Sequence, residues 1–296
     1  MPILKKTDVR PERPVIVMLY GVPGCGKTSI ATTANNPVII DTDRGADRAV
    51  QVIDTLAAQR WQDILEVTED LKEYKTIIID TAKTMLDEFL SVYVCEQNYK
   101  LRTNSLKRFG EMASEFSAFV SRLQTFGTDL IFICHDKESQ EGDIIKHSPD
   151  CTGSSKNYLQ QKADQIGYVS SVNGHRTISF QPKDNFVGKD VAGIGSVQIP
   201  DYGSEEFGTF MAGIIGRVKK SIQGKSEAQR KASELVASLR EQLAAVIDND
   251  GATALINSCK ELPSVMKAPF FTEIKKTLAG KGFTYADGKF TITTTA

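Results

Sequence analysis

The sequence predicts an α/β protein in which a mainly parallel sheet is flanked by helices and followed by a small C-terminal α+β unit. Three observations lead to this prediction. Short, uninterrupted apolar runs recur in the first half of the chain, as in strands buried on both faces of a sheet. Segments with apolar residues at three- to four-residue spacing separate these runs, which is typical of helices covering a parallel sheet. The last third is mostly helical in pattern and ends in a hairpin signal.

The individual elements follow in chain order. Four apolar runs are predicted as core strands, at residues 15–20, 38–40, 76–79 and 130–134. Apolar periodicity predicts helices over residues 86–94 and 109–126. Residues 167–171 and 177–181 are predicted as strands joined at Asn173-Gly174, a two-residue hairpin signal.

These elements divide the chain into four predicted segments, namely an N-terminal arm (1–14), the α/β core (15–204), a helical connector (205–250) and a small unit (251–296). The small unit is predicted to have two short helices and a hairpin with a turn at Asp287-Gly288. Its six lysines and three acids are compatible with a winged-helix reader of nucleic acid. A docking or oligomerisation module is favoured, because lysine-rich helix faces are usually only solvated.

Composition excludes several classes of protein. The 296 residues carry 36 Lys and Arg against 37 Asp and Glu, so the net charge is −1. A polycation that coats nucleic acid by bulk charge is therefore excluded, and any such contact must come from a local patch. The five cysteines are scattered without a CxxC pair, so their spacing offers no zinc site, and their odd number argues against a disulfide framework. No apolar run has the length of a membrane span or a signal peptide, so we expect a cytoplasmic protein without a membrane partner.

The most specific motif runs from Gly21 to Thr28 and fits GxxxxGK[ST], between a buried strand and a helix-compatible segment. Its glycines let successive backbone N–H groups face a phosphate, and the helix start adds partial positive charge. Lys27 is predicted to reach the β- and γ-phosphates of ATP, and the Thr28 hydroxyl to bind Mg²⁺. The predicted nucleotide-binding set is Gly21, Val22, Pro23, Gly24, Cys25, Gly26, Lys27, Thr28 and Ser29.

A second acid is needed at the end of another buried strand to hold Mg²⁺. Asp80 ends the run 76–79 and is predicted to take this role together with Thr28. The alternative is that Asp80 caps the helix that starts near Thr81. The two roles are compatible.

Two other strand ends carry polar residues: Asp41 and Asp43 follow one run, and His135 follows another. In this order of motifs the sequence resembles RecA-like ATPases, most closely phage-type members associated with single-strand annealing and recombination. The resemblance covers roughly residues 15–195. It implies that Asp43 polarises the attacking water and that His135 senses the γ-phosphate, where the family more often has Glu and Gln. The alternatives are a turn residue for Asp43 and a satisfied strand-end histidine for His135.

The resemblance extends to Lys189-Asp190-Val191-Ala192-Gly193, which looks like a degenerate form of a lysine-containing family motif. It implies a homo-oligomeric filament or ring in which Lys189 reaches the nucleotide of a neighbouring subunit, with Lys183 as the alternative. A solvated loop lysine is the simpler interpretation. The family also implies single-stranded DNA and single-strand-binding or other recombination proteins as partners, in a bacterial or phage-infected cell.

One basic stretch fits a DNA-binding role. Lys100, Arg102, Lys107 and Arg108 lie between two aromatic residues, Tyr99 and Phe109. Cations neutralise phosphates and rings stack on bases, so this stretch is the predicted track for single-stranded DNA. The alternative is an exposed basic helix junction with Phe109 in the core. The second candidate loop, residues 136–155, is acidic, which counts against DNA and favours a cation or a partner.

Rival functions remain open at this point. An AAA+-type loader or regulatory ATPase acting on a protein partner needs an arginine finger, and no arginine of the C-terminal region carries a recognisable motif. A small-molecule kinase needs an arginine-rich lid, which the acidic 136–155 stretch fits badly. Hydrolysis could also be vestigial, with ATP only gating assembly.

Overall fold

The computed structural model describes residues 12–151, 153–262, 264–286 and 289–292. They fall into two compact units, one of residues 12–221 and one that includes the residues from 222 onward. Helix α8 (Phe210–Ala245) contributes residues to both. Within the described ranges, no helix combines the length and apolarity that a membrane span requires.

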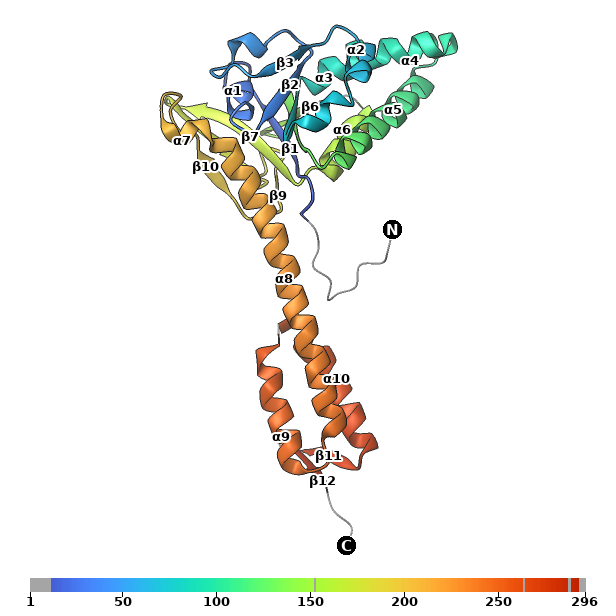
Figure 1. Cartoon of the computed structure of the whole chain (residues 1–296), viewed down its shortest axis with the longest axis vertical. Coiled ribbons are helices and arrows are strands. Elements are labelled where there is room, and N and C mark those ends of the chain that lie inside the picture. The colour runs from blue at the N-terminus through green and yellow to red at the C-terminus, as the bar shows by residue number, and fades with distance from the viewer. Residues whose placement is uncertain (1–11, 152, 263, 287–288, 293–296) are drawn as a thin grey trace. The chain divides into compact units, whose positions relative to one another are not determined.

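The first unit is built on a mixed sheet that has ten strands among the described residues (Figure 1). Six neighbouring strands run parallel, in the order β3 (Asp54–Ala57), β2 (Pro37–Asp41), β4 (Thr76–Asp80), β5 (Asp129–Glu141), β1 (Ile16–Gly21) and β7 (Gln165–Val172). Four strands join by antiparallel pairing, namely β8 (His175–Ser179) on β7, β10 (Ser196–Gln198) on β8, β6 (Ile144–Asp150) on β5 and β9 (Lys189–Asp190) on β7. The predicted α/β class is confirmed.

The central strands form where uninterrupted apolar runs were expected. All six residues of β1 are buried, and so are all five of β4. Both faces of these strands are covered, so no polar alternation is needed. The predicted hairpin is also confirmed: Asn173 and Gly174 have φ of 52° and 80°, and Val172 pairs with His175 across them.

Helices cover the sheet, as Figure 1 shows for the teal-to-green segments. They are α1 (Lys27–Ala31), α2 (Trp61–Glu66), α3 (Ala82–Thr84), a π-helical turn η3 (Met85–Leu90), α4 (Ser91–Gln97), α5 (Ser105–Thr125), α6 (Gly153–Lys162) and α7 (Glu205–Gly208). Short 3₁₀ turns are η1 (Ala46–Arg48), η2 (Asp70–Glu73) and η4 (Tyr99–Arg102). Helix α5 buries the predicted stripe from Met112 to Leu123. Phe109 was predicted on that face and is instead 40% exposed.

The acidic stretch 136–155 is not the loop that was expected. Strand β5 continues to Glu141, and β6 returns along it in register. Gly142-Asp143 makes the turn, with Gly142 at φ 64°. A glycine followed by Asp between two short runs is a hairpin signal, and the weak hydrophobicity of the flanking residues obscured it.

The second unit has its own core. The C-terminal part of α8 packs with α9 (Asn249–Ser258), η5 (Cys259–Glu261), α10 (Ser264–Gly280) and the hairpin of β11 (Phe283–Ala286) and β12 (Lys289–Ile292). Its buried residues include Leu239, Leu243, Leu255, Ile274, Leu278, Phe283 and Phe290. The order of two helices and a hairpin is as predicted, while the turn at Asp287-Gly288 lies outside the described residues.

Candidate nucleotide-binding site

The carboxyl ends of β1, β2 and β4 meet at one edge of the sheet, beside the middle of β5. Gly21 at the end of β1 pairs with His135 of β5, and Asp41 at the end of β2 pairs with Asp80 of β4. Ligand sites of α/β sheets lie at such edges. A cavity of about 250 Å³ opens there, lined by Pro23, Gly24, Gly26, Lys27, Thr28, Ser29, Asp43, Gly45, Arg48, Asp80, Thr81, His135 and Tyr202. The structure thus brings together most of the residues predicted to bind nucleotide.

The loop between β1 and α1 has the backbone that phosphate binding requires. Gly24 and Gly26 have φ of 77° and 94°, a region that side chains with a Cβ rarely adopt. The Lys27 ammonium is buried and donates to the carbonyl oxygens of Gly21 and Val22, both at 2.9 Å. A phosphate oxygen is a stronger, charged acceptor than these carbonyls. A phosphate could therefore replace these two carbonyls as the hydrogen-bond partner of the Lys27 ammonium.

Thr28 and Asp80, which were predicted to hold Mg²⁺ together, are in direct contact. The Thr28 hydroxyl donates to Asp80 Oδ2 at 2.6 Å. Burial raises the pKa of Asp80 to about 6, opposed by the Thr28 hydrogen bond and raised further by the charges of Asp43 and Asp41. A hydroxyl and a carboxylate are the hard oxygen donors that Mg²⁺ prefers, and a cation would relieve the buried charge. The residues present fit Mg²⁺.

Asp43 and His135 face each other across the same cavity. Asp43 Oδ2 lies 4.0 Å from His135 Nε2. Burial raises the pKa of Asp43, with the charge of Asp41 as a smaller contribution. The Nδ1 atom of His135 is buried and has no hydrogen-bond partner among the described residues. The His135 side chain as a whole is 42% exposed, and its other ring nitrogen, Nε2, is the one turned toward the acid.

The two acids at the end of β2 have different contacts. The Asp41 carboxylate accepts the backbone N–H groups of Gly45 at 3.1 Å and of Ala46 at 3.0 Å. Asp41 therefore shapes the turn that carries Asp43, and Asp43 is the acid that lines the cavity.

Thr42 is a site residue that the sequence did not reveal. Its hydroxyl lies 3.0 Å from the carbonyl oxygens of Asp80 and of Thr81, and it accepts the Thr81 N–H at 2.9 Å. The Thr42 N–H donates to the Asp80 carbonyl at 2.7 Å. These bonds tie the end of β2 to the end of β4, which fixes Asp43 relative to Asp80.

Arg176 and Tyr202 also went unpredicted, because neither belongs to a motif. The Arg176 guanidinium carbon lies 3.6 Å from the centre of the Tyr202 ring, and Arg176 Nη2 donates to the Pro200 carbonyl at 3.0 Å. A Cβ on Gly26 would lie 2.3 Å from the Tyr202 hydroxyl. The stacked pair therefore packs directly against the phosphate-binding loop, and only glycine fits beneath it.

The two lysines predicted to act in trans lie outside this cavity. Lys189 pairs with Ile166, which pairs with Met18 well before the carboxyl end of β1. Its ammonium donates to the carbonyls of Gln160 at 3.1 Å and Gln161 at 2.9 Å, at the end of α6. Lys183 lies over the Phe186 ring, 5.7 Å from its centre. A role for either lysine toward a neighbouring subunit stays a prediction.

The predicted DNA track forms a separate exposed surface, at η4 and the start of α5. Lys100, Arg102 and Lys107 are exposed and Arg108 is half-buried. The Arg102 guanidinium lies 5.1 Å from the centre of the Tyr99 ring, which is 73% exposed. Cations and an accessible ring are thus adjacent there, without lining the nucleotide cavity.

Comparisons with known proteins place the site in a family. The sequence profile of a family described as AAA domain matches residues 13–191, a range that contains the whole cavity except Tyr202. Among solved structures, the crystal structure of the RadB recombinase is 14% identical, with a TM-score of 0.39, and the match covers 65% of this chain and 90% of RadB. No curated protein matches the sequence at a significant level. At this identity and TM-score, the activity of RadB carries no argument about this chain.

Proposed function

This chain belongs to the AAA domain family, and from that premise we propose that it is a RecA-like, Mg²⁺-dependent ATPase that acts on single-stranded DNA in recombination, annealing or repair. One observation supports the ATPase most strongly. A single cavity holds the Lys27 ammonium, the Thr28–Asp80 pair and the Asp43–His135 pair. Phosphoryl transfer to water needs these three elements: a cradle for the phosphates, a metal site and a group that orients water.

The chain's residues divide the chemistry among them. The loop N–H groups and Lys27 bind the phosphates, and Thr28 and Asp80 would hold Mg²⁺, which neutralises charge that develops on the transferred phosphoryl group. Asp43 accepts a hydrogen bond from the attacking water and orients it. We assign the sensing of the γ-phosphate to His135 of β5, and its position 4.0 Å from Asp43 in the same cavity supports this role.

Two substitutions separate binding from turnover. Lys27→Ala should abolish ATP binding, because the buried ammonium is removed from the loop. Asp43→Asn should leave ATP binding intact and lower turnover by about 10²–10⁴-fold, the usual contribution of a positioned acid–base group. Binding is measured with a fluorescent ATP analogue and turnover by phosphate release.

Asp47→Asn is the matched control, since Asp47 is an exposed carboxylate four residues away whose side chain is 86% exposed. Equal turnover in wild type and in Asp43→Asn would remove Asp43 from the mechanism. Turnover that Lys27→Ala leaves unchanged would refute the ATPase proposal as a whole.

For the DNA partner, support comes from the exposed cations and rings of η4 and the start of α5. Lys100→Ala combined with Lys107→Ala should weaken binding of a single-stranded oligonucleotide. The slope of the logarithm of the binding constant against the logarithm of the salt concentration should become shallower by about 0.7 per lost phosphate contact. Fluorescence anisotropy at several salt concentrations, with and without ATP, measures both effects. The control replaces Lys72 and Lys75, two exposed lysines elsewhere on this unit.

Wild-type protein that hydrolyses ATP and binds no single-stranded DNA at low salt would refute the DNA part. That result would favour the alternative, an AAA+-type loader or regulatory ATPase that acts on a protein partner. The ATPase proposal would stand unaffected, because its own test does not involve DNA.

Homo-oligomeric assembly into a filament or ring is part of the same proposal. Size-exclusion chromatography with light scattering, run with an ATP analogue and with single-stranded DNA, reports nucleotide and DNA dependence together. If Lys189 acts in trans, its ammonium must exchange the Gln160 and Gln161 carbonyls for a neighbour's nucleotide. A monomer under all conditions would contradict both assembly and any trans role.

A further inference from the structure

The β5–β6 hairpin gathers three potential metal ligands on one face. Asp136 and Glu138 are two residues apart on β5, so their side chains project to the same side. His147 of β6 is the direct cross-strand partner of Glu138. One ligand atom from each of the three residues lies within 4.8 Å of the others. None of the three lines the nucleotide cavity.

Asp136 leaves one carboxylate oxygen without a partner. Its side chain is only 4% exposed, and its Oδ2 pairs with His147 Nδ1 at 2.6 Å. The other oxygen, Oδ1, is buried and has no hydrogen-bond partner among the described residues. A buried carboxylate oxygen without a donor is costly. The hydrogen bond to His147 thus satisfies only Oδ2, and Oδ1 is left available to a further ligand.

The imidazole of His147 is held by its surroundings. The His147 ring stacks on Tyr168 with 5.1 Å between centres and 27° between planes, and Tyr168 stacks on Phe186 at 5.2 Å and 28°. The Tyr20 hydroxyl, 3.3 Å from the His147 carbonyl oxygen, adds a contact to the backbone of β6. Stacking and strand pairing therefore fix the imidazole in position.

Charge favours a cation at this point. Asp136 and Glu138 bring two carboxylates to one imidazole, and the nearby Lys146 is paired with Glu141 at 3.2 Å. We propose that Asp136, Glu138 and His147 bind a divalent transition-metal cation of the Zn²⁺ class. An imidazole nitrogen with carboxylate oxygens suits Zn²⁺, whereas Mg²⁺ prefers oxygen donors alone. Zinc–ligand distances of about 2.0–2.2 Å in tetrahedral geometry separate ligand atoms by roughly 3.3 Å. The His147 Nδ1 and Asp136 Oδ2 atoms, now 2.6 Å apart, must therefore open slightly to admit the metal, and the exposed Glu138 must approach it.

Metal binding is measured on the full chain without nucleotide, by competition for Zn²⁺ with a chromophoric chelator. We expect one Zn²⁺ per chain. His147→Ala should weaken the affinity by at least about 100-fold, because loss of even an outer-shell partner costs roughly 10–100-fold. His175→Ala is the matched control, an exposed histidine outside the cluster, and should retain wild-type affinity. Equal affinity in His147→Ala and wild type overturns the proposal.

Two further measurements keep the result independent of folding. Glu138→Gln changes an exposed residue, so it should fold normally and still weaken Zn²⁺ binding. Co²⁺ in place of Zn²⁺ should give visible d–d bands without the thiolate charge-transfer band that cysteine ligands produce. A thiolate band, or wild-type affinity in Glu138→Gln, would assign the metal to other residues and refute the site. ATP turnover plays no part in these readouts, so they stand or fall separately from the proposed ATPase.

Discussion

At the scale of single residues, the candidate site contains a buried acid, Asp80, whose carboxylate accepts a hydrogen bond from the Thr28 hydroxyl. Burial raises the pKa of Asp80 from 3.8 to about 6, which corresponds to about 3 kcal/mol. Between these values the folded chain binds a proton that the unfolded chain has released. The contribution of Asp80 therefore lowers stability as pH rises from about 4 to about 6, and the full cost is present above that window. A bound cation would offset this cost, because it stabilises the charged form of Asp80.

Asp80→Asn should stabilise the nucleotide-free protein at pH 7.5 by up to about 3 kcal/mol, because it removes the buried charge and keeps an acceptor for the Thr28 hydroxyl. At pH 4 the two proteins should be equally stable. Thermal unfolding at both pH values, without Mg²⁺, measures the difference. The same substitution should abolish Mg²⁺-dependent turnover.

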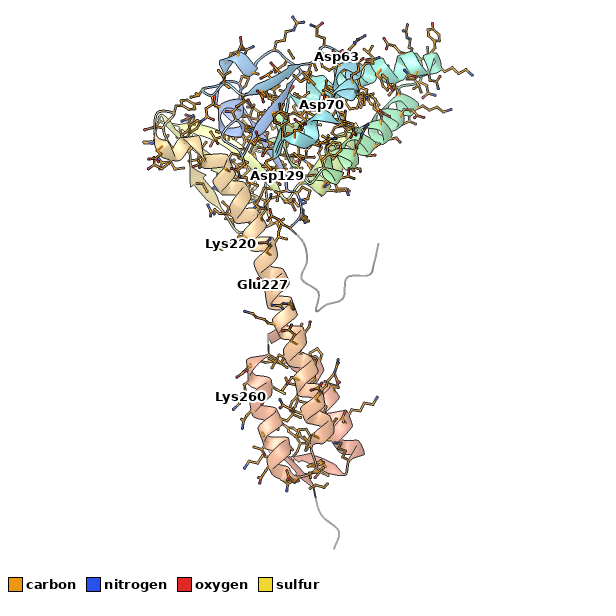
Figure 2. The ribbon with its side chains drawn as sticks, viewed as in Figure 1. Asp63, Asp70, Asp129, Lys220, Glu227 and Lys260 are labelled. Atoms are coloured by element: carbon orange, nitrogen blue, oxygen red, sulfur yellow. The ribbon has the colours of Figure 1, made fainter. Side chains whose placement is uncertain are left out.

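Asp70→Asn is the control for this experiment, since Asp70 is an exposed carboxylate of the same unit (Figure 2). It should leave the thermal stability unchanged at both pH values. A stabilisation by Asp80→Asn that is equally large at pH 4 and pH 7.5 would mean that packing, and not the buried charge, is responsible.

At the scale of elements, the first turn of α8 is tied to the turn that follows α1. The Met211 N–H donates to the Thr33 hydroxyl at 2.9 Å, in a buried position, and the Ala212 N–H donates to the Thr33 carbonyl at 3.3 Å. The start of a helix has free N–H groups, and Thr33 satisfies two of them. A second contact is the ion pair of Lys219 in α8 with Asp129 at 2.9 Å. Asp129, labelled in Figure 2, is the first residue of β5.

Thr33→Val should destabilise the unit of residues 12–221 by about 1–3 kcal/mol, because it leaves the buried Met211 N–H without an acceptor. Thr32→Val is the matched control. Thr32 is also buried, but its hydroxyl only donates to the Ser29 carbonyl at 3.0 Å, so the loss should stay below about 1 kcal/mol. Urea unfolding compares the two. Equal losses would show that α8 is not anchored through Thr33.

The same scale explains which elements could be predicted from the sequence. Strands β1, β2 and β4 are predictable because burial on both faces requires an apolar run. Helix α6 is not, because its sequence GSSKNYLQQK is largely polar and its helix packs through few residues, such as Leu159. Strand β3 is missed for a similar reason, as its residues are mostly exposed at the edge of the sheet.

The site also contains residues that the sequence predicts and residues that it does not. The positions of the loop around Lys27, of Asp80 and of His135 in one cavity are predictable, because each residue directly follows an apolar run that reads as a buried strand. Thr42, Arg176 and Tyr202 act through contacts between segments far apart in the chain. No local pattern encodes such contacts, so only the folded structure reveals them.

At the scale of the whole molecule, the chain joins a unit that holds the nucleotide cavity to a unit with a separate core. Within the second unit, the Lys281 ammonium donates to the carbonyls of Leu243, Ala244 and Val246 at 3.2, 2.6 and 2.9 Å. These are carbonyls that the end of α8 leaves without helical partners.

Two cores in one chain should give two unfolding transitions, and Lys281 should affect only one of them. Lys281→Met keeps the aliphatic stem and removes the cation from the end of α8, at a cost of about 2 kcal/mol. In a unit of this size that lowers the transition temperature by roughly 8–16 °C. Calorimetry should show this shift in one transition, with the other transition and ATP binding unchanged.

Lys276→Met, at an exposed position of the same C-terminal unit, should shift neither transition. A single transition that moves as a whole in Lys281→Met would mean that the two units unfold as one.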